Sequence, residues 1–399
     1  MGVVVQKYGG SSVGTTEKIK SIAQVAVDRK KQNTDLVIVV SAMGDTTDDL
    51  LSLSKNITEE PDKRELDALL STGEIISSAL LAMAIKSLGY DAISYTAYQI
   101  GIQTSGQYGK ALIKDMHDKK IKKSLKEGKI VIVAGFQGIN GDGDVTTLGR
   151  GGSDTTAVAL AVKLCGSCEI YTDVDGIYSV DPRVYAEAKK LDEIEYEEML
   201  ELASLGAQVM HSRSIELAQK YGIPIYVGRS NGNIKGTLIQ EVKNVNMEKK
   251  PVTGLATSDE DVAVTLQHIP KDVNTLATIF ENIGYKRINI DMISQTSSID
   301  GKMNVSFTIP KDSLKESLKI IDDLIVDNNI IVDEDITKFS MVGLGMKTTS
   351  GVAARMFRIF NENNIEIKMI TTSEIRITCA IKTEDKLKAI QVIAKEFNL

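Results

Sequence analysis

A lysine and two glycines near the start of the chain could bind a phosphate group. Lys7 is followed closely by Gly9 and Gly10, after an apolar run at residues 3–6. Glycines allow backbone N–H groups to approach an anion, and a lysine adds a full positive charge. This is not a Walker A loop, because Thr15 directly follows the last glycine with no lysine between them. We interpret the cluster as a phosphate cradle; the alternative is an ordinary glycine turn with a solvated lysine.

A second cluster, residues 149–154, combines an arginine with glycines. Arg150 has a glycine on each side, and Ser153 is expected to cap the helix that continues through residues 157–164. Glycines around an arginine at the start of a helix suit an anion. The alternative is a capped helix start with an exposed arginine. Two anion sites in one fold are a more specific signal than one.

Polar residues gather at three further places. Residues 171–183 contain aromatic side chains, carboxylates and an arginine, which would suit a nucleotide or form a polar surface loop. Residues 41–49 offer small hydroxyl side chains for a small polar ligand or a helix cap. Gly73 interrupts a helical pattern beside Glu74, which suggests close approach by a ligand. The alternative there is a helix start in which Glu74 completes a capping box.

The elements that must position these clusters follow the pattern of an α/β fold. Apolar runs typical of buried strands recur at residues 3–6, 36–40, 92–95, 130–134, 169–171 and 223–227. Helical patterns separate them at residues 65–88 and 157–164, and Thr15 or Thr16 is expected to cap a helix with an apolar stripe along residues 19–26. The alternation predicts an open, doubly wound, mainly parallel sheet with helices on both faces. Ligands in such a sheet gather beyond the carboxyl ends of the strands.

The composition excludes several classes of protein. The 399 residues are too many for one core, so two or three domains are expected. A net charge of −7 provides no basic field for nucleic acid. No apolar run approaches the roughly 18 residues of a membrane span, and no signal peptide is apparent. We therefore expect a cytoplasmic protein with neither nucleic acid nor membrane as a partner.

The cysteines do not form a clear metal or redox site. Cys165, Cys168 and Cys379 are few and odd in number, which favours reduced thiols. Cys165 and Cys168 have the CxxC spacing of a redox or zinc site. There is no second CxxC, however, and the three histidines are scattered, so we expect no metal site.

Three long motifs resemble the aspartate kinase family within the amino-acid kinases. They are residues 7–13, residues 149–154, and residues 172–178 with 181–183, and they occur in the family's order. The resemblance covers essentially the whole chain. It implies ATP-dependent phosphorylation of the side-chain carboxylate of L-aspartate to 4-phospho-L-aspartate, which opens the route to lysine, threonine and methionine. A carboxylate is already ionised at neutral pH, so we expect cationic clamping with Mg²⁺ and no general base.

The resemblance also assigns roles to individual residues. Those expected at the transferred phosphates and in catalysis are Lys7, Gly9, Gly10, Arg150 and Asp154. Those expected to hold aspartate are Ser41, Thr47, Glu74, Arg150, Gly151, Gly152 and Ser153, with Arg150 on a substrate carboxylate and Glu74 facing the ammonium. Those expected to hold ATP are Lys7, Tyr8, Gly9, Gly10, Thr172, Asp173, Tyr178, Ser179, Asp181, Pro182 and Arg183.

The sequence departs from the family pattern at two places. Many relatives carry a lysine that helps to bind ATP where this chain has Gln208. Relatives also often read Asp-Lys-Pro-Gly where this chain has residues 271–274, in the loop where an amino-acid effector would bind. The first departure bears on the affinity for ATP, and the second on which effector binds.

The chain divides into a predicted catalytic domain, residues 1–240, and a regulatory region, residues 241–399, joined by a charged linker. The regulatory region holds an internal repeat: residues 269–280 with 288–295 match residues 346–357 with 365–372. Each copy reads as strand, helix, strand, strand, helix, the order of a ferredoxin-like unit. The repeat resembles the ACT regulatory modules of the family, which implies feedback control by lysine, threonine or both.

We expect the two ACT modules to be interleaved. The second copy ends in a helix at residues 384–397, without the last strand that the first copy has at residues 330–333. The strand expected at residues 252–257 can take that place. The modules would then span about residues 262–333, and 252–258 with 336–399. We also expect at least a homodimer joined through residues 250–399.

Two other functions remain open at this point. The chain could be a related kinase acting on glutamate or acetylglutamate, although the paired ACT-like modules and the Arg150 loop disfavour it. It could also be a catalytically inactive amino-acid sensor, which the presence of Lys7, Glu74 and Asp154 disfavours and Gln208 favours. We expect no fused dehydrogenase domain.

Overall fold

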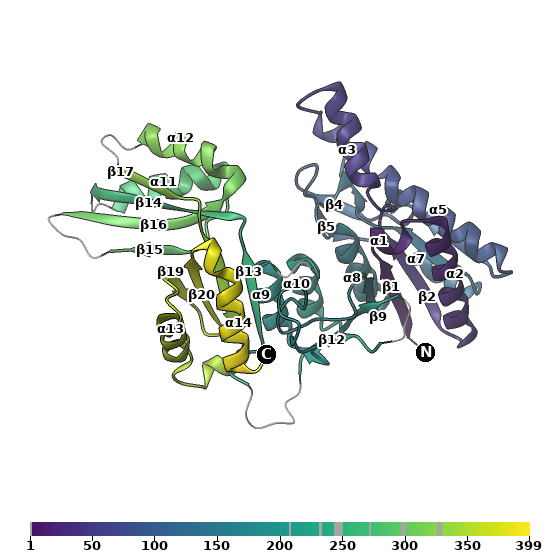
Figure 1. Ribbon diagram of the computed structural model, residues 1–399. Coiled ribbons are helices and arrows are strands. Elements are labelled where there is room, and N and C mark those ends of the chain that lie inside the picture. Colours follow the sequence, from purple (N-terminus) through teal and green to yellow (C-terminus); the bar gives the residue numbers. More distant parts are fainter. Residues whose placement is uncertain are drawn as a thin grey trace. The chain divides into compact units, whose positions relative to one another are not determined.

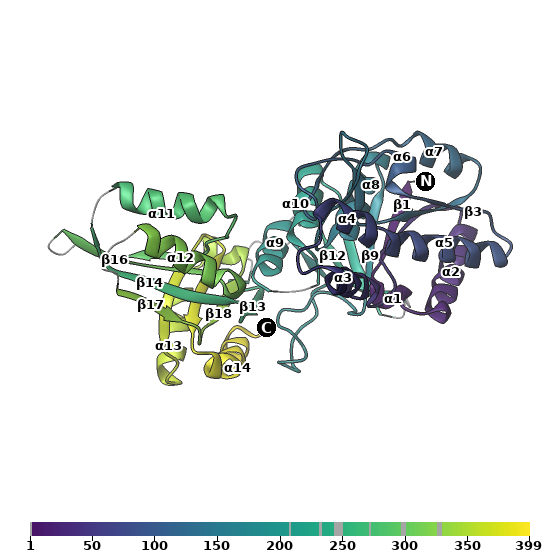
Figure 2. The ribbon, with the colours of Figure 1, turned by 90° about the horizontal axis from the view of Figure 1, so that it is seen from above.

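The structure is a computed structural model that describes residues 2–206, 209–230, 234–242, 250–270, 273–296, 301–324 and 329–399. The chain forms two compact units (Figures 1 and 2). The first comprises Met1–Ile177, Lys190–Ala203 and Gln208–Asn244, and the second comprises Tyr178–Lys189, Ser204–Ala207 and Val245–Leu399. Each unit therefore contains segments that are distant in the sequence.

The first unit is built on a large, mainly parallel sheet. Its strand order in the described residues is β10-β12-β11-β9-β1-β2-β6-β3. The strands are β1 (Val3–Tyr8), β2 (Asp35–Val40), β3 (Ala92–Tyr95), β6 (Ile130–Ala134), β9 (Ser167–Thr172), β10 (Glu193–Ile194), β11 (Ile225–Arg229) and β12 (Thr237–Ile239). Only the β11–β12 pair is antiparallel among the pairs in this sheet. Every predicted strand of the catalytic domain is present.

The order of the strands reverses next to β1. From β1 the chain passes through β2 to the edge strand β3, returns to insert β6 between β2 and β3, and later places β9 on the opposite side of β1. In open α/β sheets, the crevice at this reversal is where ligands bind. The loops that follow β1 and β9 meet at this point, and both were predicted to bind phosphate or nucleotide.

Helices cover both faces of the sheet, which confirms the doubly wound fold. On one face, α2 (Thr16–Lys31) and α5 (Thr72–Ser87) bury an apolar stripe against β2 and β6. On the other face, α8 (Gly152–Leu164) packs against β1, β2 and β9, and α10 (Ser212–Tyr221) packs against α8. The stripe of α2 consists of Ile19, Ile22, Ala23, Ala26 and Val27.

The helical pattern predicted at residues 65–88 is two helices. α4 (Lys63–Leu70) ends at Leu70, and Ser71 separates it from α5, which begins at Thr72. By length and composition the whole stretch Lys63–Ser87 could cross a membrane, contrary to the prediction that no run approaches this size; half of its most apolar window is buried. α5 packs against α2, β3 and β6, as a core helix does.

A small sheet lies beside the large one within the first unit. Its order is β5-β4-β7-β8, with β4 (Gln103–Ser105), β5 (Leu112–Asp115), β7 (Gln137–Ile139) and β8 (Val145–Thr147). The remaining helices of this part of the chain are α1 (Gly10–Val13), α3 (Thr46–Ile57), α6 (Ala97–Ile100), α7 (Lys119–Lys126) and α9 (Tyr196–Ser204). β7 and β8 form an antiparallel hairpin that leads directly into the Arg150 loop.

The second unit contains two sheets, each covered on one face by two helices. One sheet has the order β15-β16-β14-β17 and the other has the order β13-β18-β20-β19. The strands are β13 (Gly254–Ser258), β14 (Asp261–Pro270), β15 (Ile293–Gln295), β16 (Lys302–Pro310), β17 (Asn329–Asp333), β18 (Thr337–Val342), β19 (Ile367–Thr372) and β20 (Arg376–Ile381). The helices are α11 (Val273–Tyr285) and α12 (Leu314–Leu324) on the first sheet, and α13 (Val352–Glu362) and α14 (Lys386–Phe397) on the second.

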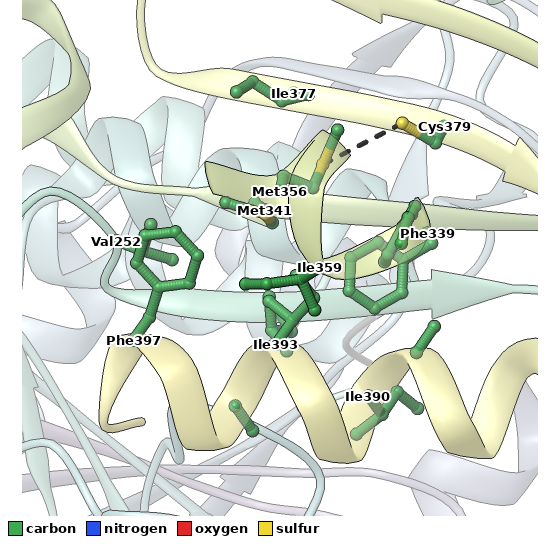
Figure 3. Packing of buried hydrophobic residues seen from close by; sticks show 14 of the residues in the cluster. Val252, Phe339, Met341, Met356, Ile359, Ile377, Cys379, Ile390, Ile393 and Phe397 are labelled. Atoms are coloured by element: carbon green, nitrogen blue, oxygen red, sulfur yellow. Dashed lines mark hydrogen bonds between the residues drawn. The ribbon is translucent and has the colours of Figure 1, made fainter. Parts of the chain in front are cut away.

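The strand β13 pairs antiparallel with β18 of the second module, from Gly254 opposite Val342 to Ser258 opposite Lys338. This pairing supports the interleaved arrangement, which remains our proposal for the regulatory region. The core of the second module includes Val252, Phe339, Ile393 and Phe397 (Figure 3). The two helices of the second copy, α13 and α14, both contribute side chains to this core.

Candidate active site

Lys7 lies on β1 and forms an ion pair with the first turn of α8. Side chains alternate along a strand, so Gln6 and Tyr8 face α2 while Lys7 faces α8. The Lys7 Nζ lies 2.7 Å from the Asp154 Oδ1, and both side chains are largely buried. The structure thus joins two predicted site residues that are 147 positions apart.

The glycines after β1 form a turn in close contact with the loop after β2. The Gly9 N–H donates to the Tyr171 carbonyl over 3.2 Å, and the Gly44 N–H donates to the Gly10 carbonyl over 3.1 Å. A Cβ atom on Gly10 would lie 2.9 Å from the Ala42 carbonyl oxygen, so any larger residue would push the two loops apart. Glycine at this position is required by the close approach of these backbones.

The helix after this turn begins differently from the prediction. A short helix, α1, begins at Gly10, and α2 follows it with Thr15 as the capping residue. The Thr15 Oγ1 accepts from the Lys18 N–H over 3.3 Å. Thr15 was one of the two residues predicted to cap this helix. The turn therefore leads into two successive helices.

A stacked pair of tyrosines, which the sequence did not reveal, lies next to the glycine turn that follows β1. The Tyr8 and Tyr171 rings are stacked with centroids 5.1 Å apart, at the ends of neighbouring strands. Glu169 accepts from Gln6, Tyr171 and Arg29 at 2.7–2.9 Å. Tyr8 was predicted to contact ATP, but its side chain is fully buried in this layer and faces away from Lys7.

Glu74 is a buried carboxylate with one unpaired oxygen. Its Oε1 accepts from the Ala42 N–H over 3.0 Å, whereas its buried Oε2 has no hydrogen-bond partner. Burial raises the pKa of Glu74 to about 7. Ser41 and Thr47, the other predicted aspartate-binding residues in this region, are half-buried in the loop after β2 and in the first turn of α3. An ammonium group near the free oxygen would satisfy Glu74 and restore its charge.

Two alternatives for this region are wrong. Glu74 does not complete a capping box, because its carboxylate bonds to the distant Ala42 amide and Ser71 makes no side-chain cap. Gly73 does not provide room for a ligand either. A Cβ on Gly73 would lie 2.7 Å from the Ala42 Cβ, so this glycine allows α5 to pack against the loop after β2.

The Arg150 loop is shaped by glycines with left-handed backbone conformations. Gly149 has φ of 77° and Gly151 has φ of 66°. Gly151 is the N-terminal cap residue of α8, so the prediction that Ser153 caps this helix is wrong. Ser153 lies instead in the first turn, where its Oγ would be 2.7 Å from a Cβ on Gly135. Arg150 is exposed and has no hydrogen-bond or ion-pair partner among the described residues.

The start of α10 packs against this loop, which the sequence analysis did not anticipate. A Cβ on Gly151 would lie 2.1 Å from the His211 Cβ. The His211 Nδ1 accepts from the Arg213 N–H over 3.3 Å, so a neutral His211 carries its proton on Nε2. Burial, followed by repulsion from Arg213, lowers the pKa of His211. No sequence signal linked this histidine to a glycine 60 positions earlier.

The predicted nucleotide residues fall in both compact units. In the first unit, Thr172 donates to the Asp173 carboxylate over 3.0 Å, and Arg229 donates to the Asp173 carbonyl over 3.0 Å. Tyr178, Ser179, Asp181, Pro182 and Arg183 belong to the second unit. There, Ser179 is buried, its Oγ accepts from the Lys189 N–H, and its carbonyl accepts from the Leu255 N–H.

The segment that follows Ser179 contains one buried apolar side chain and one ion pair at the surface. Val180 is buried in the core of the second ACT-like module, against Val252 and Leu255. Arg183 and Asp181 form a two-pronged ion pair with distances of 2.8–3.2 Å at the surface. Gln208 and residues 271–272 lie outside the described residues. The expected effects of the two departures, on the affinity for ATP and on the choice of effector, therefore stay predictions.

The two cysteines of the CxxC pair lie in different environments. Cys165 is exposed at the end of α8, whereas Cys168 is buried on β9. Burial raises the pKa of Cys168, which is opposite to what a metal ligand or reactive thiol requires. Within the described residues, no group of three or more His, Cys, Asp or Glu side chains is placed to hold a metal ion.

Known proteins that resemble this chain share its whole length. Residues 2–229 match the amino acid kinase family, and residues 263–324 and 339–397 match the ACT domain. The chain is 46% identical over 404 residues to an aspartokinase of Bacillus sp. (strain MGA3), which covers 100% of this chain and 98% of that protein. It is 44% identical over 403 residues to aspartokinase 2 of Bacillus subtilis (strain 168), with the same coverage.

Solved structures give the same result. Escherichia coli aspartokinase III in complex with aspartate and ADP has a TM-score of 0.83 and 25% identity, covering 98% of this chain and 99% of that chain. The same protein in complex with lysine and aspartate has a TM-score of 0.78 and 25% identity, covering 99% of both chains. With relatives matched over their full lengths, this chain belongs to the aspartokinase family, with an amino acid kinase domain and ACT domains.

Proposed function

We propose that the residues described above transfer the terminal phosphoryl group of ATP to the side-chain carboxylate of L-aspartate. The product is 4-phospho-L-aspartate, and the reaction opens the route to lysine, threonine and methionine. The observation that carries the assignment of residues is the 2.7 Å ion pair between Lys7 and Asp154, at the reversal of strand order. Membership of the aspartokinase family supports the choice of aspartate as acceptor.

The main barrier to this reaction is repulsion between two anions. The attacking carboxylate is ionised at neutral pH and needs no general base. Lys7 and the N–H group of Gly10 hold the phosphates, whereas the Gly9 N–H is already bonded to the Tyr171 carbonyl. Asp154 keeps the Lys7 ammonium in place before the phosphates arrive. Positive groups fixed in advance stabilise the charge that develops during transfer.

Glu74 and Arg150 hold the two ends of the amino acid. The unpaired Oε2 of Glu74 accepts from the aspartate ammonium, which removes the cost of a buried carboxylate without a partner. Arg150, which is exposed and unpaired among the described residues, donates to the α-carboxylate. The remaining residues of this subsite are Ser41, Thr47, Gly151, Gly152 and Ser153.

ATP binds with Mg²⁺ at the carboxyl ends of β1 and β9. Glycine at position 10 keeps the turn after β1 packed against the loop after β2, which holds the backbone of this turn at the carboxyl end of the strand. Mg²⁺ offsets the charge of the phosphates when it is bound. Since the described residues offer no metal cluster, phosphate oxygens and water would supply most of its ligands, as is usual for this ion. Of the residues that the resemblance assigns to the nucleotide, Thr172 and Asp173 lie in the same unit as β1 and β9.

The regulatory region binds an amino-acid effector, which is lysine, threonine or both, and joins two or more copies of the chain. The match of residues 263–324 and 339–397 to ACT domains supports this proposal. So does the complex of the related E. coli aspartokinase III with lysine and aspartate. We further propose a cytoplasmic location for the enzyme.

The release of ADP tests both parts of this proposal. The purified chain is given MgATP with L-aspartate, L-glutamate or N-acetylglutamate, each with and without added lysine and threonine. Of the three acceptors, we expect only aspartate to support turnover. We expect lysine or threonine to reduce the rate of this turnover. Turnover only with glutamate or N-acetylglutamate would identify a different kinase, and undiminished turnover with every effector would refute the regulatory proposal.

A further inference from the structure

A buried aspartate on α4 holds the strand that leads into the Arg150 loop. Asp67 is 1% exposed. Its Oδ2 accepts from the Thr147 N–H over 2.7 Å and from the Gly109 N–H over 2.9 Å, and its Oδ1 accepts from the Thr147 hydroxyl over 2.8 Å. Asp67 therefore connects α4 to two segments, residues 109–111 and residues 147–148, that are close in space and distant in sequence.

An arginine on α10 holds the same two segments. The Arg213 Nη1 donates to the Leu148 carbonyl over 2.7 Å, and its Nη2 donates to the Ala111 carbonyl over 3.0 Å. The segments are also bonded to each other, because the Ala111 N–H donates to the Thr147 carbonyl over 3.0 Å. The planar guanidinium spans them in a way that a single ammonium group cannot.

Asp67 and Arg213 form their hydrogen bonds with backbone groups and one hydroxyl group. Neither Asp67 nor Arg213 has an ion-pair partner within the described residues. Burial lowers the pKa of Arg213, so its charge is costly to place there. Buried charges are retained in proteins where their hydrogen bonds fix a specific arrangement.

The arrangement that they fix is the base of the Arg150 loop. Leu148 is buried, and Gly149 turns so tightly that a Cβ on it would lie 2.9 Å from the Gly109 carbonyl oxygen. Arg150 is the next residue and is exposed. Its side chain has no hydrogen bond or ion pair among the described residues, so its position depends mainly on the backbone of the loop.

We propose that Asp67 and Arg213 are positioning residues that hold the Arg150 loop in the conformation that binds aspartate. The proposal rests on the proposed role of Arg150 in binding the substrate carboxylate. Loss of either residue loosens the loop without removing the positive charge on it. The effect falls on the KM for aspartate, because the ATP-binding residues on β1 and β9 are held by other contacts.

The side-chain chemistry predicts a definite order among variants. Asp67→Leu removes both acceptors, and we expect the KM for aspartate to rise about 10- to 100-fold. Asp67→Asn keeps an acceptor for the two N–H groups and offers an amide to the Thr147 hydroxyl, which can turn to accept it, so we expect a change of about threefold or less. Arg213→Gln should raise the KM for aspartate as much as Asp67→Leu does. Thr147→Val loses only the hydroxyl, so it should fold normally and change this KM little.

The experiment measures KM and kcat for both substrates, with Arg355→Gln as the control. Arg355 forms an ion pair with Glu396 in the second unit, so its loss tests the general effect of removing a half-buried arginine. We expect the KM for ATP to change by about twofold or less in every variant, since the hydrogen bonds of Asp67 and Arg213 within the described residues reach none of the ATP-binding residues on β1 and β9. Equal increases in the KM for aspartate and for ATP would overturn the proposal.

Two further readouts separate this proposal from the role of Arg150. If Asp67 acts through Arg150, then Asp67→Leu combined with Arg150→Ala should have a KM for aspartate no higher than Arg150→Ala alone. Hydrogen exchange of residues 145–152 without substrate should be faster in Asp67→Leu and Arg213→Gln and unchanged in Arg355→Gln. Unchanged exchange would overturn the proposal. Faster exchange in Asp67→Leu and Arg213→Gln, together with a normal KM for aspartate in Arg150→Ala, would refute the role of Arg150. It would still show that Asp67 and Arg213 hold the loop in place.

Discussion

The stability of the enzyme should fall as the pH rises through the titration of Glu74. Burial raises the pKa of Glu74 from 4.5 to about 7, so the native state retains a proton that the unfolded chain has released. Below about pH 4.5 both states are protonated and Glu74 costs nothing; above about pH 7 the native state holds a buried, ionised carboxylate. At about 1.4 kcal/mol for each pH unit, the cost reaches about 3 kcal/mol.

The matched variant is Glu74→Gln, which keeps the shape of the side chain and cannot ionise. Urea unfolding of both proteins in the same buffers from about pH 5 to pH 8 gives the difference in the free energy of unfolding. We expect the variant to gain about 2–3 kcal/mol relative to the wild type across this range. Other titrating groups cancel in the comparison. A difference that does not change with pH would show that Glu74 is ionised at little cost and would refute the reasoning.

The same carboxylate should make aspartate binding depend on pH. The substrate ammonium supplies the partner that Glu74 Oε2 lacks, and it prefers the ionised form. The KM for aspartate should therefore rise up to about tenfold for each pH unit below about 7 in the wild type, and the Glu74→Gln variant should lose this dependence. Identical pH dependence in the two proteins would place the ammonium elsewhere.

Three other changes test the account. Lys7→Ala should lower kcat/KM by about 10²- to 10³-fold while circular dichroism stays native, because it removes a fixed cation at the phosphates; full activity would remove Lys7 from the site. Gly73→Ala should destabilise the chain by about 1–3 kcal/mol in urea, despite the better helix propensity of alanine, because its Cβ would lie 2.7 Å from that of Ala42. Light scattering should give at least twice the 43.4 kDa of one chain; a monomer would refute the proposed dimer.

The central sheet could be predicted because buried parallel strands are nearly continuous apolar runs. The runs at residues 92–95 and 130–134 coincide with β3 and β6. The stripe at residues 19–26 likewise faces the core on α2. These features depend on local patterns that the tertiary structure does not override.

Details that depend on contacts between distant residues could not be predicted. Ser153 has the chemistry of a helix cap, but Gly151 takes that position because its backbone is left-handed and His211 packs against it. The partner of Glu74 is the Ala42 amide, 32 residues away. A local capping rule cannot anticipate either contact, since each is set by how two loops approach each other.

The candidate site shows the same division. The Lys7 and Arg150 clusters could be found because glycines beside basic residues are visible in the sequence. The supporting roles of Asp67 and Arg213 were missed, because they come from buried hydrogen bonds to segments distant in the sequence. Tyr171 borders the predicted nucleotide motif, but its stacking on Tyr8 was not predicted. The packing of Val180 in the core of the second ACT-like module was also hidden, because it joins segments about 70 residues or more apart.

The formation of an acyl phosphate on aspartate tests the central claim most directly. Hydroxylamine added to the reaction with MgATP and L-aspartate converts such a product to a hydroxamate, which simple hydrolysis of ATP does not form. We expect hydroxamate to accumulate in proportion to ADP with the wild-type chain, and to be absent with Lys7→Ala. ADP release without hydroxamate, or hydroxamate formation by the Lys7→Ala variant at the wild-type rate, would contradict the account.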